Sequence, residues 1–288
     1  MFNKIGIVGP GLIGGSIGKF YKAKGKDVVC FGRNKDRLRI AKREGVCGDF
    51  STDLSKAGGC GIVAVCTPVD VITQISKSVI PFMKKGAILI DTGSVKSEIC
   101  RKVHPFAKRY GIEFVGCHPM AGSEKSGCIN SRGDLFRGTN VLLTPVSGTG
   151  KGALKKVKKF WSDLGADCSV VRPDKHDEFA ALTSHLPHVI SFCFTEMFLS
   201  YLKKSKISPA FIAGSFKNMT RVSKSSPFSW NAIFKQNSPE INRHIKKFTG
   251  TLDNFKKNIN DRRLLKKLND IRNAYEGFEN KTRKKNIR

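Results

Sequence analysis

The sequence of 288 residues lacks several features that would assign it to a specialised class of protein. Its nine cysteines include no pair with C-x-x-C spacing, so neither a zinc knuckle nor a thioredoxin-type motif is expected. Scattered cysteines in odd number are typical of reduced thiols in the cytosol. A strand pattern begins at residue 4, which leaves no room for a signal peptide. The most apolar later stretch, residues 186–199, is too short to span a bilayer. We therefore expect a cytoplasmic protein that does not associate with membranes.

Acidic residues are scarce as well. The chain has 23 Asp and Glu against 52 Lys and Arg, which gives a formal net charge of +29. Such an excess can indicate a nucleic-acid-binding protein. Here the basic residues are spread along the chain, and no recognition helix, stacking-aromatic pattern or concentrated basic arm accompanies them. We expect no nucleic-acid partner, and a dinucleotide-binding regulatory or nucleic-acid-binding protein is the alternative from a different class.

The pattern of apolar residues changes near residue 172. Before this point short apolar runs alternate with helical patterns, which predicts a Rossmann-type α/β domain with a mostly parallel sheet. Beyond it only helices are expected, at residues 174–203, 209–216, 230–236 and 239–276. We predict a dinucleotide-binding domain over 1–172, a helical domain over 173–280 and a flexible basic tail over 281–288. The strands are expected at residues 4–8, 27–31, 61–66, 87–91, 113–116, 141–144 and 168–171, and the helices between them at 13–23, 35–44, 69–82, 95–110 and 152–164.

A glycine motif follows the first predicted strand. Gly9-Pro10-Gly11-Leu12-Ile13-Gly14 has the G-x-G-x-x-G pattern and opens an apolar helix, which is the context that dinucleotide binding requires. Gly9 would allow the tight turn, Gly11 the approach of the backbone to pyrophosphate, and Gly14 close packing of helix on strand. The backbone of Leu12 and Ile13 would lie at the positive end of the helix, where phosphates bind.

The end of the second predicted strand indicates which dinucleotide binds. NAD-binding domains commonly place an acidic residue here to bind the ribose 2′-hydroxyl. This sequence has Phe31-Gly32-Arg33-Asn34 instead, with Lys35 and Arg37 nearby. An arginine at this point suits the 2′-phosphate of NADP, so NADP is favoured over NAD.

Four further segments carry polar residues at places where catalysis or binding is expected. Two of them follow predicted strands, where a doubly wound fold places its ligands. The helical half contains the other two. The segments are Gly93-Ser94-Val95-Lys96, residues 117–127 (Cys-His-Pro-Met-Ala-Gly-Ser-Glu-Lys-Ser-Gly), Ser184-His185-Leu186-Pro187-His188, and Phe216-Lys217-Asn218-Met219-Thr220-Arg221 with Trp230 nine residues later.

With these motifs in this order, residues 4 to about 230 resemble the prephenate/arogenate dehydrogenases of tyrosine biosynthesis. The resemblance implies oxidative decarboxylation of a cyclohexadienol dicarboxylate, with hydride passing to NAD(P). It implies that His118 is the catalytic histidine, which receives the proton of the ring hydroxyl, and that Ser94 helps to orient this pair. A neutral histidine suits this task because it titrates near the working pH. A serine before a helix is also an ordinary N-cap, so Ser94 has a structural alternative.

The resemblance also implies a substrate pocket between the two domains. Arg221 corresponds to the substrate-binding arginine, and its guanidinium suits a carboxylate. His188 and His185 would be polar groups of this pocket, with His188 the one expected to reach the substrate. Alternatively, one of the two packs beside Pro187 with its hydrogen bond satisfied. The remaining candidates for substrate binding are Ser184, His188, Glu124, Lys125 and Trp230, and those for cofactor binding are Thr67 and Gly93.

Several expectations complete this interpretation. The proposed activity is a prephenate dehydrogenase; an arogenate dehydrogenase is the nearest alternative, and another reductase of the β-hydroxyacid or ketopantoate type is a more distant one. No metal is expected, because His185 and His188 lack a third ligand at metal spacing. The helical half resembles the family's dimerisation domain, so a homodimer is expected. Its phenylalanines at 192, 194, 198, 211 and 216 would supply apolar area either to this interface or to an internal core.

Overall fold

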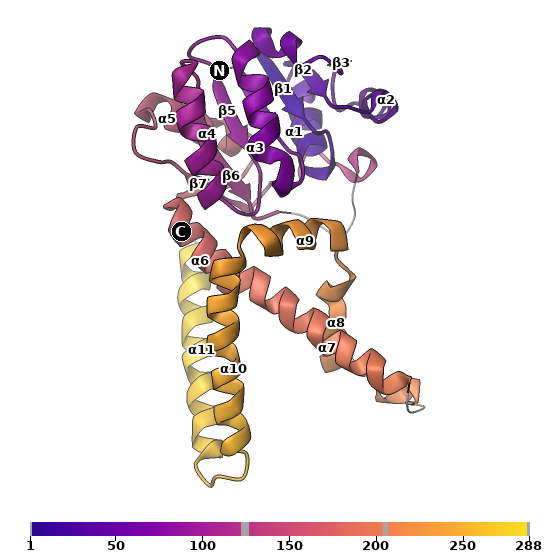
Figure 1. Ribbon diagram of the computed structural model, residues 1–288, viewed down its shortest axis with the longest axis vertical. Helices are drawn as coiled ribbons and strands as arrows, with labels where there is room; N and C mark the ends of the chain where they lie inside the picture. The colour runs from indigo at the N-terminus through magenta and orange to yellow at the C-terminus, as the bar shows by residue number, and fades with distance from the viewer. Residues whose placement is uncertain (1, 122–126, 204–206, 287–288) are drawn as a thin grey trace. The chain divides into compact units, whose positions relative to one another are not determined.

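The structure is a computed structural model that describes residues 2–121, 127–203 and 207–286. The chain divides into two compact units, Met1–Ile241 and Asn242–Arg288. The larger unit contains a sheet with its covering helices and a group of further helices, and the smaller one is helical (Figure 1). Within the described residues, no helix is long and apolar enough to cross a membrane.

An eight-stranded sheet forms the centre of the larger unit, with strand order β3-β2-β1-β4-β5-β6-β7-β8. Neighbouring strands are parallel except for β6 and β7. The predicted α/β domain is thereby confirmed. The sequence interpretation missed β3, because three residues are too few to show an apolar pattern. The strands are β1 (Lys4–Val8), β2 (Asp27–Phe31), β3 (Asp49–Ser51), β4 (Ile62–Val65), β5 (Ile88–Asp91), β6 (Glu113–Pro119), β7 (Asn140–Thr144) and β8 (Asp167–Val170).

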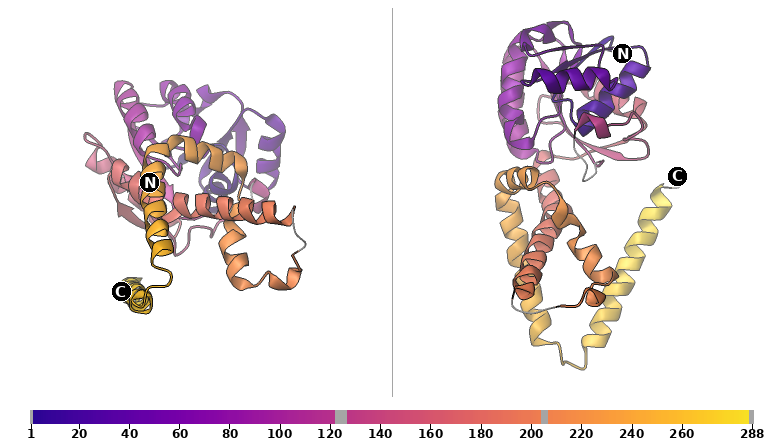
Figure 2. Two further views of the ribbon diagram at one scale, coloured as in Figure 1. Left: turned by 60° about the horizontal axis from the view of Figure 1, so that its bottom comes forward. Right: turned by 90° about the vertical axis from the view of Figure 1, so that its right-hand side faces the viewer.

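Helices cover both faces of this sheet (Figure 2). On β1, Ile5 and Ile7 point to one face and Val8 to the other, and all three are almost fully buried. Parallel strands that are covered on both sides are apolar nearly throughout, which is why they were visible in the sequence. Helices α1 (Leu12–Ala23), α2 (Lys35–Arg43) and α5 (Lys151–Asp163) lie on one face, and α3 (Val69–Val79) and α4 (Ser97–Arg109) on the other.

The helical part of the larger unit begins with α6 (Pro173–Ala180), α7 (Leu186–Leu202), α8 (Gly214–Thr220) and α9 (Pro227–Gln236). The single helix predicted over 174–203 is interrupted by a π-helical turn, Ala181–His185, just before Pro187. Proline lacks the N–H that would continue the α-helical pattern, and a wider turn accommodates this loss. Helix α9 packs on α3, where Gln236 donates a 2.9 Å hydrogen bond to the carbonyl of Val69.

The single helix predicted over residues 239–276 is wrong. Two helices are present, α10 (Ser238–Lys257) and α11 (Leu264–Asn286). The residues between them include Asn258, Asn260 and Asp261, whose side chains compete for backbone hydrogen bonds. Asp261 accepts a 2.8 Å bond from the backbone N–H of Arg263, which stabilises this turn. Helix α11 continues through Asn286 and so contains most of the segment predicted to be a flexible tail.

Candidate active site

The glycine loop between β1 and α1 has the geometry that a bound pyrophosphate needs. Gly9 has φ +83°, a conformation that side chains rarely adopt, and this permits the turn. A Cβ on Gly11 would meet no atom within 4 Å, so this backbone borders open space. A Cβ on Gly14 would lie 2.6 Å from the carbonyl oxygen of Gly9 and 2.9 Å from Ile7. The three glycines therefore occupy positions suited to the turn, the approach of a ligand and the packing of α1.

The N-terminus of α1 lies directly beyond this loop. Leu12 and Ile13 form its first turn, and no side chain caps the helix at Gly11. The side-chain oxygen of Thr67, which follows β4, is buried without a hydrogen-bond partner among the described residues. Thr67 also borders the glycine loop, because a Cβ on Gly9 would lie 2.9 Å from its methyl group. An orphaned hydroxyl beside uncapped helix N–H groups fits a site for a dinucleotide.

Arg33 follows β2 and is exposed to solvent, as are Lys35 and Arg37. The nearest acidic residue along the chain, Asp36, is bonded to Arg39 at 2.6 Å. A Cβ on Gly32 would make an ordinary contact with Leu38 at 3.4 Å, so packing does not require glycine there. The cations at the end of β2 are thus available to an anionic group.

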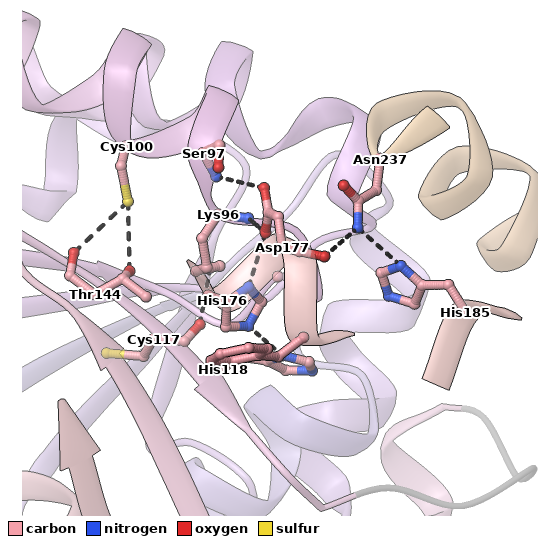
Figure 3. A network of polar contacts seen from close by, with 12 residues as sticks. Lys96, Ser97, Cys100, Cys117, His118, Thr144, His176, Asp177, His185 and Asn237 are labelled. Atoms are coloured by element: carbon pink, nitrogen blue, oxygen red, sulfur yellow. Dashed lines mark hydrogen bonds and ion pairs between the residues drawn. The ribbon is translucent and has the colours of Figure 1, made fainter. Parts of the chain in front are cut away.

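His118 lies on β6 and belongs to a buried polar network (Figure 3). Its Nδ1 is 2.8 Å from Nε2 of His176, at the start of α6. His176 Nδ1 donates in turn to the carboxylate of Asp177, also at 2.8 Å. Burial lowers the pKa of His118 well below its ordinary value, and the nearby His176, Lys96 and His185 lower it further. His118 is therefore neutral near pH 7, as a proton acceptor must be.

Lys96 connects the strands beneath this network to α4. Its side chain is fully buried, forms an ion pair with Asp91 at the end of β5, and donates a 2.9 Å hydrogen bond to the carbonyl of Cys117. The backbone N–H groups of Lys96 and Ser97 donate to the carboxylate of Asp177 at 2.7 and 2.8 Å. Asp177, which belongs to α6, thereby caps the N-terminus of α4.

Ser94 lies in the connection between β5 and α4 and is half-buried. The N-cap of α4 is Lys96, two residues later, and its free N–H groups are bound by Asp177. The interpretation of Ser94 as the N-cap of this helix is therefore wrong. Gly93 is buried and donates its N–H to Asp91 at 2.9 Å, and a Cβ there would lie 2.7 Å from Ile72. This glycine is required for close packing behind the loop.

The histidines of the π-helical turn and α7 meet an aromatic residue of α9. The ring of His188 stacks on Trp230 with centroids 3.5 Å apart, and that of His185 meets Trp230 edge to face at 5.9 Å. His188 donates from Nδ1 to the carbonyl of Ser184 at 2.9 Å, so these two residues lie on the same face of the helix. Its Nε2 is consequently the nitrogen without a proton when the ring is neutral.

His185 is buried and accepts a hydrogen bond at Nδ1 from the side-chain amide of Asn237, at 3.0 Å. The same amide donates to the backbone carbonyl of Asp177 at 2.9 Å. Burial lowers the pKa of His185 to about 4; Asp177 opposes this effect, and His176 and His188 add to it. His185 is thus a neutral ring at physiological pH, and its satisfied hydrogen bond agrees with the structural alternative.

Arg221 begins a short 3₁₀ helix, Arg221–Lys224, and is exposed. Burial lowers the pKa of His188, the bond to Ser184 opposes this, and the positive charge of Arg221 lowers it further. Arg221 is therefore close enough to His188 to affect its charge. Glu124 and Lys125 lie outside the described residues.

Sequence reasoning did not identify His176, Asp177 or Asn237. His176 is 58 residues from His118, and Asp177 is 81 residues from Lys96, so no local spacing connects them. The available signal was an adjacent His-Asp pair within the short helix that follows the last strand. Only the packing of α6 against α4 and β7 reveals what this pair contacts.

Comparison with known proteins follows the same division of the chain. Residues 17–170 match the family described as prephenate dehydrogenase, nucleotide-binding domain, and residues 172–271 match the prephenate dehydrogenase dimerization domain. The cyclohexadienyl dehydrogenase of Zymomonas mobilis is 34% identical over 84% of this chain and 83% of its own length.

Two solved structures are similar over almost the whole chain. The prephenate dehydrogenase from A. aeolicus in complex with hydroxyphenyl propionate and NAD+ has a TM-score of 0.86 and 28% identity, and the match covers 96% of this chain and 98% of that one. Synechocystis arogenate dehydrogenase has a TM-score of 0.78 and 25% identity, with 94% and 99% covered.

Proposed function

The chain belongs to the prephenate dehydrogenase family and is an NAD(P)-dependent oxidoreductase of tyrosine biosynthesis, and we propose that it converts prephenate to 4-hydroxyphenylpyruvate with a preference for NADP. Prephenate carries a ring hydroxyl, a ring carboxylate and a keto acid side chain. The residues that we assign to its recognition come from both the sheet domain and the helices that follow it.

His118 is the proton acceptor in this proposal. Its neutral ring takes the proton of the substrate hydroxyl, which helps hydride to leave the same carbon. The bond between the ring and its carboxylate breaks, carbon dioxide departs, and the released electron pair completes the aromatic ring. The phenolate so formed takes the proton back from His118. The nicotinamide, when bound, supplies the hydride acceptor.

Ser94 and the residues around His188 orient the substrate. Ser94 is not engaged as a helix cap, which leaves its hydroxyl for the hydroxyl of the substrate and His118. Arg221 binds a carboxylate of the substrate, and His188, Ser184 and Trp230 form the neighbouring wall. Glu124 and Lys125 are assigned to the same pocket from the sequence alone.

The preference for prephenate over arogenate rests on charge. Arogenate carries an ammonium group in place of the keto oxygen, and a carboxylate would be needed to balance it. The two carboxylates of the His118 network, Asp91 and Asp177, are engaged with Lys96, His176 and backbone N–H groups. Glu124 is assigned to the pocket together with Lys125, so this pair adds no net negative charge. Arg221 adds positive charge near His188. A keto acid side chain with its carboxylate fits these surroundings better than an amino acid.

The cofactor preference rests on Arg33. It is exposed at the end of β2, where the adenosine ribose lies in domains of this type, and Asp36 is already bonded to Arg39. Gly9, Gly11, Gly14 and the first turn of α1 would hold the pyrophosphate. Thr67, whose buried hydroxyl lies beside this loop, and Gly93 are assigned to the same cofactor. Arg33 could therefore bind a 2′-phosphate here, and the carboxylate of Asp36, bonded to Arg39, would not be free to repel it.

We also propose a homodimer formed by the helical domain, with the boundary between the domains near residue 172. Of the expected phenylalanines, Phe194 and Phe198 contact Phe216, and Phe192 contacts Phe234, but all of these rings are only half-buried, and Phe211 is exposed. In the smaller unit, α11 exposes Leu268, Ile271, Tyr275 and Phe278 at the spacing of a helix–helix seam. Sedimentation analysis should show a dimer, and Ile271→Asp should weaken it.

A spectrophotometric assay at the nicotinamide absorbance tests the activity. Prephenate and arogenate are each combined with NAD and NADP. We expect the highest kcat/KM with prephenate and NADP. Faster turnover of arogenate would contradict the substrate assignment, and a preference for NAD would contradict the role of Arg33.

A further inference from the structure

His176 and Asp177 hold the ring of His118 from its Nδ1 side. Asp177 Oδ1 accepts from the backbone N–H of Lys96 at 2.7 Å and from Nδ1 of His176 at 2.8 Å, and Oδ2 accepts from Ser97 at 2.8 Å. Burial opposes ionisation of Asp177, but these hydrogen bonds outweigh it and lower the pKa of the carboxyl. Asp177 is therefore a carboxylate, which can only accept hydrogen bonds.

The positions of the protons on the two histidines follow from this carboxylate. His176 must carry its proton on Nδ1 to donate to Asp177, so the Nε2 of a neutral His176 has none. That Nε2 is 2.8 Å from Nδ1 of His118, and such a contact requires one proton between the nitrogens. The proton must belong to His118 Nδ1. The Nε2 of His118 is then bare and can accept a proton from the substrate.

We infer that His176 and Asp177 are positioning residues for this reaction: they keep His118 in the tautomer whose Nε2 is a proton acceptor, and they stabilise the imidazolium that forms when it accepts one. This inference rests on the proposed function of His118. A buried aspartate plays the corresponding part in Ser-His-Asp triads, where its replacement by asparagine gives the wrong histidine tautomer. Here a second histidine lies between the carboxylate and the base.

Lys96 holds both ends of this chain of hydrogen bonds, the strand that carries His118 and the carboxylate of Asp177. The ammonium of Lys96 binds the carbonyl of Cys117, the residue before His118, while the backbone N–H of Lys96 binds Asp177 (Figure 3). His176 has 1% of its surface exposed and Lys96 none. The two rings and the carboxylate are thus fixed relative to one another before any substrate arrives, which is the condition for effective preorganisation.

Nitrogen NMR of the intact protein labelled with ¹⁵N-histidine tests the tautomer directly, because protonated and bare ring nitrogens resonate far apart. In the unliganded wild type near pH 7.5 we expect His118 to show a protonated Nδ1 and a bare Nε2. His118→Asn identifies its resonances. The opposite pattern, with the proton on Nε2, would overturn the inference whether or not the protein oxidises prephenate.

Variants of His176 distinguish control of the His118 tautomer from a merely structural role of His176. His176→Leu removes the acceptor for Nδ1, so His118 should populate both tautomers and kcat should fall about 10²-fold, within the range for a general base. His176→Gln offers an amide oxygen to the same Nδ1 and should restore the tautomer and part of kcat. Asp177→Asn should also admit the inverted tautomer, because an amide nitrogen can donate to His176.

Thr144→Val is the matched control. Thr144 is buried in the same region and contacts Cys100, but no member of the histidine pair (Figure 3). It should leave the His118 spectrum and kcat within about twofold of wild type, as expected of a substitution outside the network. A His176→Leu variant with unchanged tautomer and kcat would refute the inference. If the wild type shows the expected pattern, with the proton of His118 on Nδ1, but fails to oxidise prephenate, only the proposed function would be refuted.

Discussion

Two ion pairs lie on either side of the start of α4 and have opposite surroundings. Lys96 and Asp91 have no exposed side-chain surface, whereas Lys102 and Glu98, one turn into the helix, are each 41% exposed. The first pair also binds the strand that carries His118 and the helix that carries Asp177. The second is an ordinary i,i+4 pair on the outer face of the helix.

The difference shows which of the many charges in this basic chain have structural or chemical consequences. A buried charge has lost its hydration and depends on its partners, so removing one partner is costly. An exposed charge keeps its water and is screened by salt. Most of the 52 basic residues resemble Lys102 more than Lys96, and the net charge of +29 therefore says little about the reaction.

The largest effect should come from the proton acceptor at the edge of the buried region. In His118→Asn, kcat should fall about 10²–10⁴-fold, because a general base of this kind contributes that much to the rate. Dinucleotide affinity, measured by fluorescence titration, should remain unchanged. Near-normal turnover would show that the buried network does not serve the chemistry.

Lys96→Met should lower the free energy of unfolding by about 3–5 kcal/mol, because it leaves the carboxylate of Asp91 buried and unpaired. Urea denaturation measures this loss. The double variant Lys96→Met/Asp91→Leu removes both charges and should recover much of the stability. If Lys96→Met lowered the free energy of unfolding only slightly, the buried and the exposed ion pair would not differ in their contribution to stability.

Acid should destabilise the protein through His185. The ring has a pKa of about 4 in the folded chain, against 6.5 as its ordinary value. Between these values the unfolded chain binds a proton that the folded one does not, so stability falls as the pH drops from about 6.5 to 4, by roughly 3 kcal/mol in total. His185→Gln cannot titrate, so its stability curve should be flatter. Parallel curves for the two proteins would contradict this assignment.

Arg33→Asp probes an exposed charge that has a proposed ligand. The exchange should lower kcat/KM for NADP by about tenfold or more, because a hydrogen bond to a charged group contributes roughly 1.5–3 kcal/mol. The value for NAD should rise. Arg109→Asp, which changes an exposed arginine at the end of α4 on the other face of the sheet, serves as the control. Equal effects from both variants would indicate general electrostatics.

The smallest effect is expected from Lys102→Met. An exposed i,i+4 pair contributes about 0.3–0.5 kcal/mol, and added salt should reduce even this difference. Urea denaturation at low and high ionic strength compares it with Lys96→Met. A loss as large as that of the buried pair would show that exposure does not separate the two.

The fold was accessible from the sequence wherever one segment carried its own signal. The buried parallel strands were visible as apolar runs, and the glycine loop as a spaced motif. The break between α10 and α11 was missed, since the apolar spacing continues on both sides of Asn258 and Asp261. The wide turn before Pro187 was not predicted, because a proline in a sequence indicates a lost hydrogen bond but not how the helix accommodates the loss.

The candidate site divides in the same way. His118, Ser94 and Arg221 stand in motifs that mark them, and their roles remain predictions that the variants above test. His176, Asp177 and Asn237 carry no such mark. Their importance arises from contacts with residues far away in the chain, and a single sequence contains no record of those contacts.

The sequence by itself determined most of the order of elements, the dinucleotide-binding loop and the identity of the groups available for chemistry, because these depend on local spacing and residue type. The tertiary structure decided which groups are paired, which are buried and where their protons lie. Lys96 illustrates the division: in the sequence it is one of 52 basic residues. Only the packing of α4, α6 and the strand ends removes it from water and joins it to Asp91, Cys117 and Asp177. Burial then makes those partners indispensable, which is why the fold, and not the composition, distinguishes this lysine from the others.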